Sequence, residues 1–498
     1  MLFNSQGFIF FYLPVVFLGF FWIAGTNHRL AALWLAAASL FFYGWWNPKF
    51  VLLLLASVSF NYGIGYAIGH AHVAGTRTPH TKRLLVFSIV ANLALLGYFK
   101  YTNFFITATN EILDTGWTLF NIVLPLGISF FTFTQIAFLV DTYRGIVKEY
   151  NFVHYLLFVT YFPHLIAGPV LHHKEMMPQF ALSSTYRLSY ENLSVGLTIF
   201  FIGLFKKVVI ADSIGTYVGP VFAAPAAGTE LTFIEAWGGA LCYTLQLYFD
   251  FSGYSDMAIG LSRLFGITLP LNFHSPYKSA SIIEFWRRWH MTLSRFLKEY
   301  LYLPLGGNRK GGGRRYLNLM VVMLLGGLWH GAGWTYILWG GLHGLYLCIN
   351  HGWHNLRKRL ELNPKAPLSK LMHALSVLIT FLAVVAAWVV FRADNLHAAI
   401  AILKAMLGVN GISYDAANSL IMGDTIIYIW ICLLIVWFAP NTQQIMATFK
   451  PALDCPEDCE ARQQLWKPTA LWAFCIFSLG FISIVMLSTH SPFLYFQF

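Results

Sequence analysis

The sequence predicts an all-α, polytopic integral membrane protein with about 11 transmembrane helices plus re-entrant and interfacial helices. Hydrophobic residues make up 57% of its 498 residues, and charged residues only 11%. Soluble domains carry about 25% charged residues, so these charges cannot cover the surface of so long a chain. The apolar excess must face lipid or lie inside the fold, which excludes a soluble multidomain enzyme and a disordered protein. The 45 Phe, 25 Tyr and 17 Trp agree, because aromatic residues anchor membrane proteins at the interface.

Apolar runs follow one another along the whole chain. Several can cross about 30 Å of hydrocarbon at about 1.5 Å per residue, and others are short or broken by Gly and Pro, as in re-entrant helices. No linker or charged tract separates two cores, so we expect a single membrane domain over residues 1–498. The first run has neither a basic flank nor a cleavage site, which predicts a retained helix. The runs lie near residues 7–24, 30–46, 50–69, 83–98, 118–140, 152–171, 193–210, 233–249, 316–350, 371–391, 425–438 and 469–488.

Basic residues concentrate in three segments between these runs, at 70–83, 263–315 and 357–365. Lys and Arg are typical of cytoplasmic loops, so these segments should face the cytoplasm, whereas 408–424 lacks basic residues and should face outward. Two of the basic segments flank the 316–350 run. That run must therefore enter the membrane and return, with His330 near its turning point.

His330 is the first candidate for chemistry. It lies in GLWHGAGW, next to Trp329 and close to Trp334. Glycines here let the backbone approach other groups, tryptophans can wall a pocket, and imidazole can take and return a proton near neutral pH. The alternative is a structural role, in which a buried His bonds to a carbonyl and braces a helix bend.

His290 is the second candidate, in the segment IEFWRRWHMTLSRFLKEYLYLPLGG. Cationic and aromatic residues alternate here at helical spacing, which predicts an amphipathic interfacial helix. Its cationic side could also receive an anionic nucleotide, because Arg binds two phosphate oxygens at once. The basic Gly-rich stretch 303–315 lacks the Walker spacing and is either a flexible loop or a loop that closes over phosphates. The candidate donor-binding residues are Arg287, Arg288, Arg295, Asn308, Arg309 and Lys310, and Trp286 is a candidate residue that lines a tunnel or supports the site.

Two acids, Asp250 and Asp256, lie inside an apolar run, where an unpaired carboxylate is costly. Asp250 could orient a His or pair with an Arg, or it could bridge two helices without taking part in chemistry. With Ser252 and Tyr254 it forms a candidate set of residues supporting the site. The nearby pair at 206–207, both Lys, is expected at a membrane edge.

Two partner classes are not expected. The net charge of +11 would suggest nucleic acid for a soluble protein, but this chain has no polar basic domain. Cys455 and Cys459 form a C-x3-C pair without neighbouring His or Cys, so we expect no metal site.

The segments around both histidines resemble the signature region of the membrane-bound O-acyltransferases, in their bacterial alginate O-acetylation branch. FWRRWHMTLSRFLKEYLYLPLGGNRKG and LLGGLWHGAGWTYILWGGLHG carry the resemblance most strongly. Further segments agree in order along nearly the whole chain, among them YFPHLIAGPVLHHKE, GLFKKVVIAD, YFDFSGYSDMAIG and the terminal FLYFQF.

The resemblance implies an acyltransferase core crossed by a tunnel, with catalytic residues at His330 and His290. Acetyl-CoA, as a substrate and not a bound cofactor, would enter from the cytoplasm with its phosphates near 287–315. His330 would act as general base on an acceptor hydroxyl, and His290 or a backbone N–H would stabilise the oxyanion. The implied setting is the bacterial inner membrane, surrounded by lipid, where the acetyl group passes to an exported acetyltransferase partner that modifies a polysaccharide such as alginate or cellulose.

Two other functions stay open from the sequence. One is D-alanyl transfer to teichoic acid, in which the donor is a thioester on a carrier protein. The other is a transporter or flippase, since broken helices and buried acids also occur there, although this chain shows no internal repeat.

Overall fold

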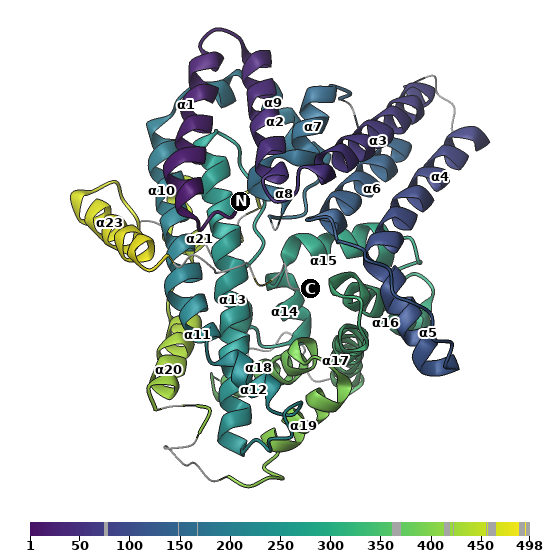
Figure 1. The fold of residues 1–498 in the computed structure, drawn as a ribbon, viewed down its shortest axis with the longest axis vertical. Coiled ribbons are helices and arrows are strands. Elements are labelled where there is room, and N and C mark those ends of the chain that lie inside the picture. The colour runs from purple at the N-terminus through teal and green to yellow at the C-terminus, as the bar shows by residue number, and fades with distance from the viewer. Residues whose placement is uncertain are drawn as a thin grey trace. The chain divides into compact units, whose positions relative to one another are not determined.

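The computed structural model describes residues 1–498 except 74–77, 148, 167, 361–369, 413–418, 422, 455, 457–464, 488–493 and 495–498. Figure 1 shows that the described chain is built from helices. The described residues contain no β-strand, only an isolated bridge between Pro270 and Leu453. The all-α prediction is confirmed. The C-x3-C pair and most of the terminal FLYFQF lie outside the described residues.

The described residues divide into two compact units, the first formed by Met1–Phe205, Tyr254–Leu271 and the described part of Thr442–Phe496. The second unit is formed by Lys206–Gly253 and Asn272–Asn441. The expectation of one domain over 1–498 stays a prediction. The α-helices of the first unit are α1 (Leu13–Ala24), α2 (His28–Gly44), α3 (Lys49–Val73), α4 (Pro79–Leu96), α5 (Thr102–Leu113), α6 (Ile128–Arg144), α7 (Phe152–Thr160), α8 (Phe162–Leu165), α9 (His173–Ala181), α10 (Tyr190–Phe205), α21 (Thr442–Ile445) and α23 (Ala470–Val485). Those of the second unit are α11 (Asp212–Gly215), α12 (Val218–Ala223), α14 (Ile282–Arg288), α15 (Met291–Leu297), α16 (Gly311–His330), α17 (Trp334–Arg359), α18 (Lys370–Arg392), α19 (Leu396–Met406) and α20 (Gly423–Phe438), and α13 (Phe233–Leu264) contributes to both units.

Shorter helical turns connect these elements. Four are π-helical: η1 (Phe8–Tyr12), η2 (Gly97–Tyr101), η4 (Lys206–Ala211) and η6 (Lys298–Tyr302). The 3-10 turns are η3 (Ser183–Tyr186), η5 (Pro276–Lys278) and η7 (Ala447–Phe449). Wide π-turns occur where a helix accommodates an extra residue, often near functional sites.

Among the described residues, four continuous helical stretches are long and apolar enough to cross a membrane, at Lys49–Ala71, Pro79–Leu113, Tyr190–Gly215 and Lys370–Arg392. Shorter apolar helices occur at Phe8–Ala24, Leu396–Met406, Gly423–Phe438 and Ala470–Val485. Their outward faces carry large apolar side chains, such as Trp22, which is 82% exposed. Such faces suit lipid, and the count of about 11 crossings stays a prediction.

Polar side chains inside the first unit are bonded to one another. Asn61 on α3 and Asn92 on α4 exchange two amide hydrogen bonds of 3.1 and 2.6 Å. Asp256 accepts hydrogen bonds from the Thr442 hydroxyl at 2.6 Å and the Gln443 amide at 3.2 Å. The buried acid is therefore satisfied within this unit, as its position in an apolar run requires.

The 316–350 run forms the helical hairpin α16–α17, as the charge pattern predicts. Its helices pack at backbone contact, because a Cβ added to Gly327 would lie 2.2 Å from the Tyr336 carbonyl oxygen. A Cβ on Gly340 would lie 2.2 Å from the Met323 carbonyl oxygen. Glycine at these two positions is thus what allows the close approach.

Candidate active site

His330 is the last residue of α16, and three residues, Gly331–Gly333, connect it to α17. Its side chain is 6% exposed. The imidazole is surrounded by aromatic rings, with centroids 5.0 Å away in Trp329, 5.2 Å in Trp339 and 5.5 Å in Phe391. The hairpin therefore places this histidine at its closed end, inside an aromatic enclosure.

His290 lies at a break between two short helices. The predicted continuous amphipathic helix over this segment is wrong, because α14 ends at Arg288 and α15 begins at Met291. His290 itself has φ +43° and ψ +53°, the left-handed region that few residues other than glycine adopt. Its side chain is fully buried, with the Phe251 ring packed edge-on at 4.9 Å.

Backbone hydrogen bonds hold this break in place. The Met291 N–H donates to the Asn272 carbonyl, and the His274 N–H donates to the Arg288 carbonyl, both at 2.9 Å. These bonds pair the chain before α14 with the chain around the break. The unusual backbone conformation of His290 is thus fixed from both sides.

The two predicted histidines lie close together within the second unit. Their ring centroids are 6.5 Å apart, and the Trp329 ring lies 6.4 Å from His290. The Asn272 side-chain oxygen lies 3.1 Å from Nδ1 of His290. The same oxygen accepts the Thr292 hydroxyl at 2.9 Å and the Thr292 N–H at 3.5 Å.

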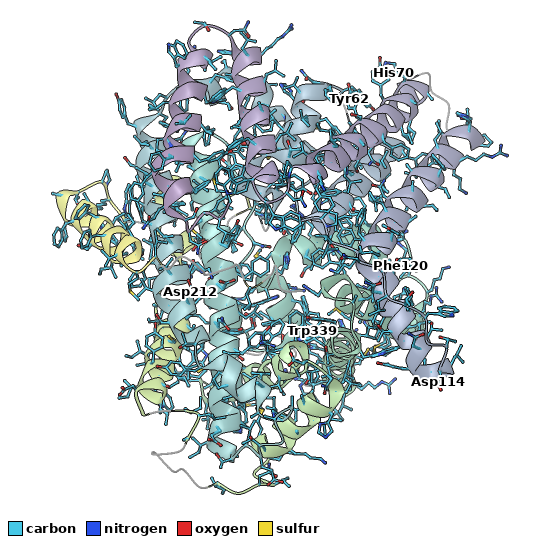
Figure 2. The ribbon with its side chains drawn as sticks, viewed as in Figure 1. Tyr62, His70, Asp114, Phe120, Asp212 and Trp339 are labelled. Carbon is cyan, nitrogen blue, oxygen red and sulfur yellow. The ribbon has the colours of Figure 1, made fainter. Side chains whose placement is uncertain are left out.

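A third buried histidine, His343 on α17, extends the enclosure. The Trp286 indole N–H donates to its Nδ1 at 3.2 Å. The Trp339 ring, labelled in Figure 2, contacts both His330 and His343, with centroid distances of 5.2 and 4.8 Å. Trp388 stacks on Trp339 at 5.5 Å and lies 6.1 Å from His343. Trp286 thus belongs to the aromatic enclosure, and its role beside a tunnel stays a prediction.

The predicted donor-binding residues differ in exposure and in their bonds to other side chains. Arg288 forms an ion pair with Glu284 at 2.8 Å, whereas Arg287, Asn308, Arg309 and Lys310 are exposed and Arg295 is half-buried. Among these, Asn308 accepts a hydrogen bond from the Tyr302 hydroxyl.

Only the first part of the basic Gly-rich stretch 303–315 forms a loop. Residues 303–310 form turns, but 311–315 already belong to α16. The buried Asn318 amide donates to the Leu305 carbonyl at 3.3 Å and the Gly307 carbonyl at 3.1 Å. The loop is therefore fastened to the hairpin that carries His330.

Asp250 forms an ion pair with Lys207 at 2.6 Å, and Lys207 pairs equally closely with Asp212, labelled in Figure 2. Lys207 is 1% exposed, and its expected place at a membrane edge stays a prediction. The cluster joins η4, α11 and α13, which agrees with the bridging role left open for Asp250. Ser252 is buried on α13, while Tyr254 stacks on Phe3 in the first unit at 4.6 Å.

Some residues of the site have no marked sequence signal. Trp334 is 49% exposed, whereas Trp339 and Trp388, which the sequence does not single out, are buried and stacked on each other. Asn272, 18 positions before His290, lies in a loop and belongs to no motif that we could interpret. No group of three or more His, Cys, Asp or Glu side chains could hold a metal ion among the described residues.

An apolar helical scaffold that buries two neighbouring histidines is typical of a multi-pass membrane protein with an enclosed site. The chain belongs to the MBOAT, membrane-bound O-acyltransferase, family, whose sequence pattern matches residues 116–389. It is 43% identical to the peptidoglycan O-acetyltransferase of Helicobacter pylori, over all of this chain and 98% of the relative. It is 45% identical to the probable alginate O-acetylase AlgI of Pseudomonas aeruginosa, over 82% of this chain and 75% of the relative. The teichoic acid D-alanyltransferase of Streptococcus thermophilus is 29% identical over 53% of this chain and 68% of the relative. Family membership makes the protein an O-acyltransferase and sets aside the transporter alternative.

Proposed function

We propose that this protein transfers acetyl groups from cytoplasmic acetyl-CoA, across the bacterial inner membrane, toward an extracytoplasmic acceptor for cell-envelope polysaccharide. The observation that carries the proposal is the pair of buried imidazoles, His290 and His330, with centroids 6.5 Å apart. Relatives that match most of the chain at 43 and 45% identity are named for O-acetylation, of peptidoglycan and of alginate. An exported acetyltransferase is the partner that would complete the modification.

The chemistry requires that a weak nucleophile be activated. An acceptor hydroxyl attacks the thioester carbonyl carbon only as its proton is removed, so a base within hydrogen-bond reach is needed. One imidazole of the pair takes the proton, a role that the family resemblance assigns to His330. The carbon–sulfur bond then breaks, and the imidazolium returns the proton to the thiolate.

The surroundings of the pair support transfer over hydrolysis. Trp329, Trp339 and Phe391 enclose His330, and exclusion of bulk water protects a thioester from hydrolysis. The exposed cations Arg287, Arg309 and Lys310 are suited to the phosphates of the donor.

Transfer from labelled acetyl-CoA, measured with the purified protein in lipid and a soluble acceptor, tests the proposal. His330→Ala should insert into lipid and unfold as the wild type does, but its transfer rate should fall about 100-fold or more. His354→Ala is the matched control, because His354 is an exposed histidine on α17. Transfer by His330→Ala at the wild-type rate would overturn the assignment of His330 as a catalytic residue. Accumulation of labelled substrate inside the lipid vesicles, without release of free CoA, would overturn enzymatic transfer.

D-alanyl transfer is the second candidate, favoured only by the 29% identical teichoic acid D-alanyltransferase. Its donor is a thioester on a carrier protein. The same assay with an aminoacyl carrier protein in place of acetyl-CoA separates the two functions. We expect turnover with acetyl-CoA as donor and none with the carrier protein.

A further inference from the structure

The Asn272 side chain determines which nitrogen of His290 carries hydrogen. The Thr292 N–H can only donate, and it points at the same Asn272 atom as the Thr292 hydroxyl, at 3.5 and 2.9 Å. That atom is therefore the amide oxygen, an acceptor. His290 Nδ1 lies 3.1 Å from this oxygen and must donate to it.

This bond fixes the tautomer of the neutral ring. With hydrogen on Nδ1, Nε2 carries a lone pair and can only accept. A neutral His290 is thus unable to donate through Nε2 to an oxyanion, the role that the family resemblance suggests for it. The geometry suits it to receive a proton instead.

The spacing of the two histidines is compatible with one oxygen atom bonded to both rings. Two imidazoles joined by a direct N–H···N bond have centroids about 5 Å apart, since N···N is about 2.9 Å and each nitrogen lies about 1.1 Å from its centroid. The observed 6.5 Å is too long for that bond. A single oxygen atom bonded to both rings gives about 6 to 7 Å, which matches.

We propose that Asn272 is a positioning residue that locks His290 as a proton acceptor, so that the acceptor hydroxyl bridges His290 and His330. The inference rests on the proposed function and changes its division of labour, because His290 takes the proton and His330 donates a hydrogen bond to the hydroxyl oxygen. The hydroxyl donates its hydrogen to Nε2 of His290 and accepts a hydrogen bond from His330. As the oxygen bonds to the thioester carbonyl carbon, its proton moves to Nε2, the carbon–sulfur bond breaks, and the thiolate takes the proton from the imidazolium.

Three variants of the Asn272–Thr292 pair test this role. Asn272→Leu keeps the size of the side chain but removes the acceptor, and kcat should fall about 10-fold or more with the KM for acetyl-CoA unchanged. Asn272→Asp restores an acceptor oxygen and should recover most of that loss. Thr292→Val is the matched control, since it removes a hydrogen bond to the same oxygen but leaves Nδ1 of His290 bonded, and kcat should stay within about 3-fold of wild type. Equal losses in Asn272→Leu and Thr292→Val would overturn the proposal.

The tautomer can be measured without activity, by nitrogen-15 magnetic resonance of histidine-labelled protein in lipid, with His290→Asn used to assign the signal. We expect hydrogen on Nδ1 in the wild type and in Thr292→Val, and a change of tautomer in Asn272→Leu. Hydrogen on Nε2 in the wild type would overturn the inference even if acetyl transfer is intact. A wild type that does not use acetyl-CoA would instead overturn the proposed function, and the resonance would still decide the tautomer.

Discussion

The α16–α17 hairpin depends on two glycines, and one methyl group on either should disturb it. At Gly340 an added Cβ would lie 2.2 Å from the Met323 carbonyl oxygen, and at Gly327 it would lie 2.2 Å from that of Tyr336. Ordinary contacts of this kind are about 3.4 Å or more, so the helices must separate by about 1 Å to accept the methyl. The obstacle is backbone, which cannot rotate away as a side chain does.

The neighbouring glycines provide matched controls. A Cβ on Gly341 would meet Leu324 Cδ2 at 3.5 Å, and one on Gly326 would meet Leu297 Cδ1 at 3.5 Å, both ordinary contacts. There Gly→Ala should stabilise the helix by about 0.5 to 1 kcal/mol through propensity alone. At Gly340 the same gain is opposed by overpacking of about 1 to 3 kcal/mol or more, so Gly340→Ala should be less stable than Gly341→Ala by about that amount.

Thermal unfolding in detergent and acetyl transfer in lipid would be measured for both pairs. Gly327→Ala should lose more activity than Gly326→Ala, because Gly327 is one helical turn from His330 and separation of the helices displaces the imidazole. Equal unfolding temperatures and rates within each pair would refute the reasoning that backbone contact sets the hairpin geometry.

Two other predictions concern buried polar groups of the second unit. Lys207→Met leaves the buried Asp250 carboxylate without its partner at 2.6 Å and should lower the free energy of unfolding by about 3 to 5 kcal/mol. Adding Asp250→Leu should restore part of that loss. A double-mutant cycle in chemical denaturant measures both effects. Failure of the second change to restore stability would contradict the pairing. Asn318→Leu removes both hydrogen bonds that fasten the 303–310 loop and should raise the KM for acetyl-CoA more than it lowers kcat; an unchanged KM would show that this loop does not serve the donor.

Composition and charge placement predict the class of fold and the hairpin. Scarce charge requires an apolar helical scaffold, and two basic segments around 316–350 require a run that returns to the side it came from. The structure has that turn at Gly331–Gly333, directly after His330. Only the family resemblance predicts that His290 and His330 lie close together, because they are forty positions apart in the sequence with a loop between them.

Local periodicity fails where tertiary contacts override it. The alternation of cationic and aromatic residues around His290 is helical on both sides, yet backbone bonds from Asn272 and His274 break the helix between Arg288 and Met291. Asn272 is likewise invisible as a site residue, since a lone loop Asn carries no pattern. The ion pairs of Lys207 with Asp212 and Asp250 are equally invisible, because the two carboxylates come from different elements.

The left-handed backbone conformation at position 290 also restricts which amino acids can occupy that position. Asn and Gly tolerate φ of +43°, whereas β-branched side chains are strongly disfavoured there. An alanine or valine scan would therefore mix strain in the α14–α15 turn with loss of the imidazole. Asparagine is the substitution that removes the ring while leaving the turn relaxed, and natural sequence variation at this position should be confined to the same short list.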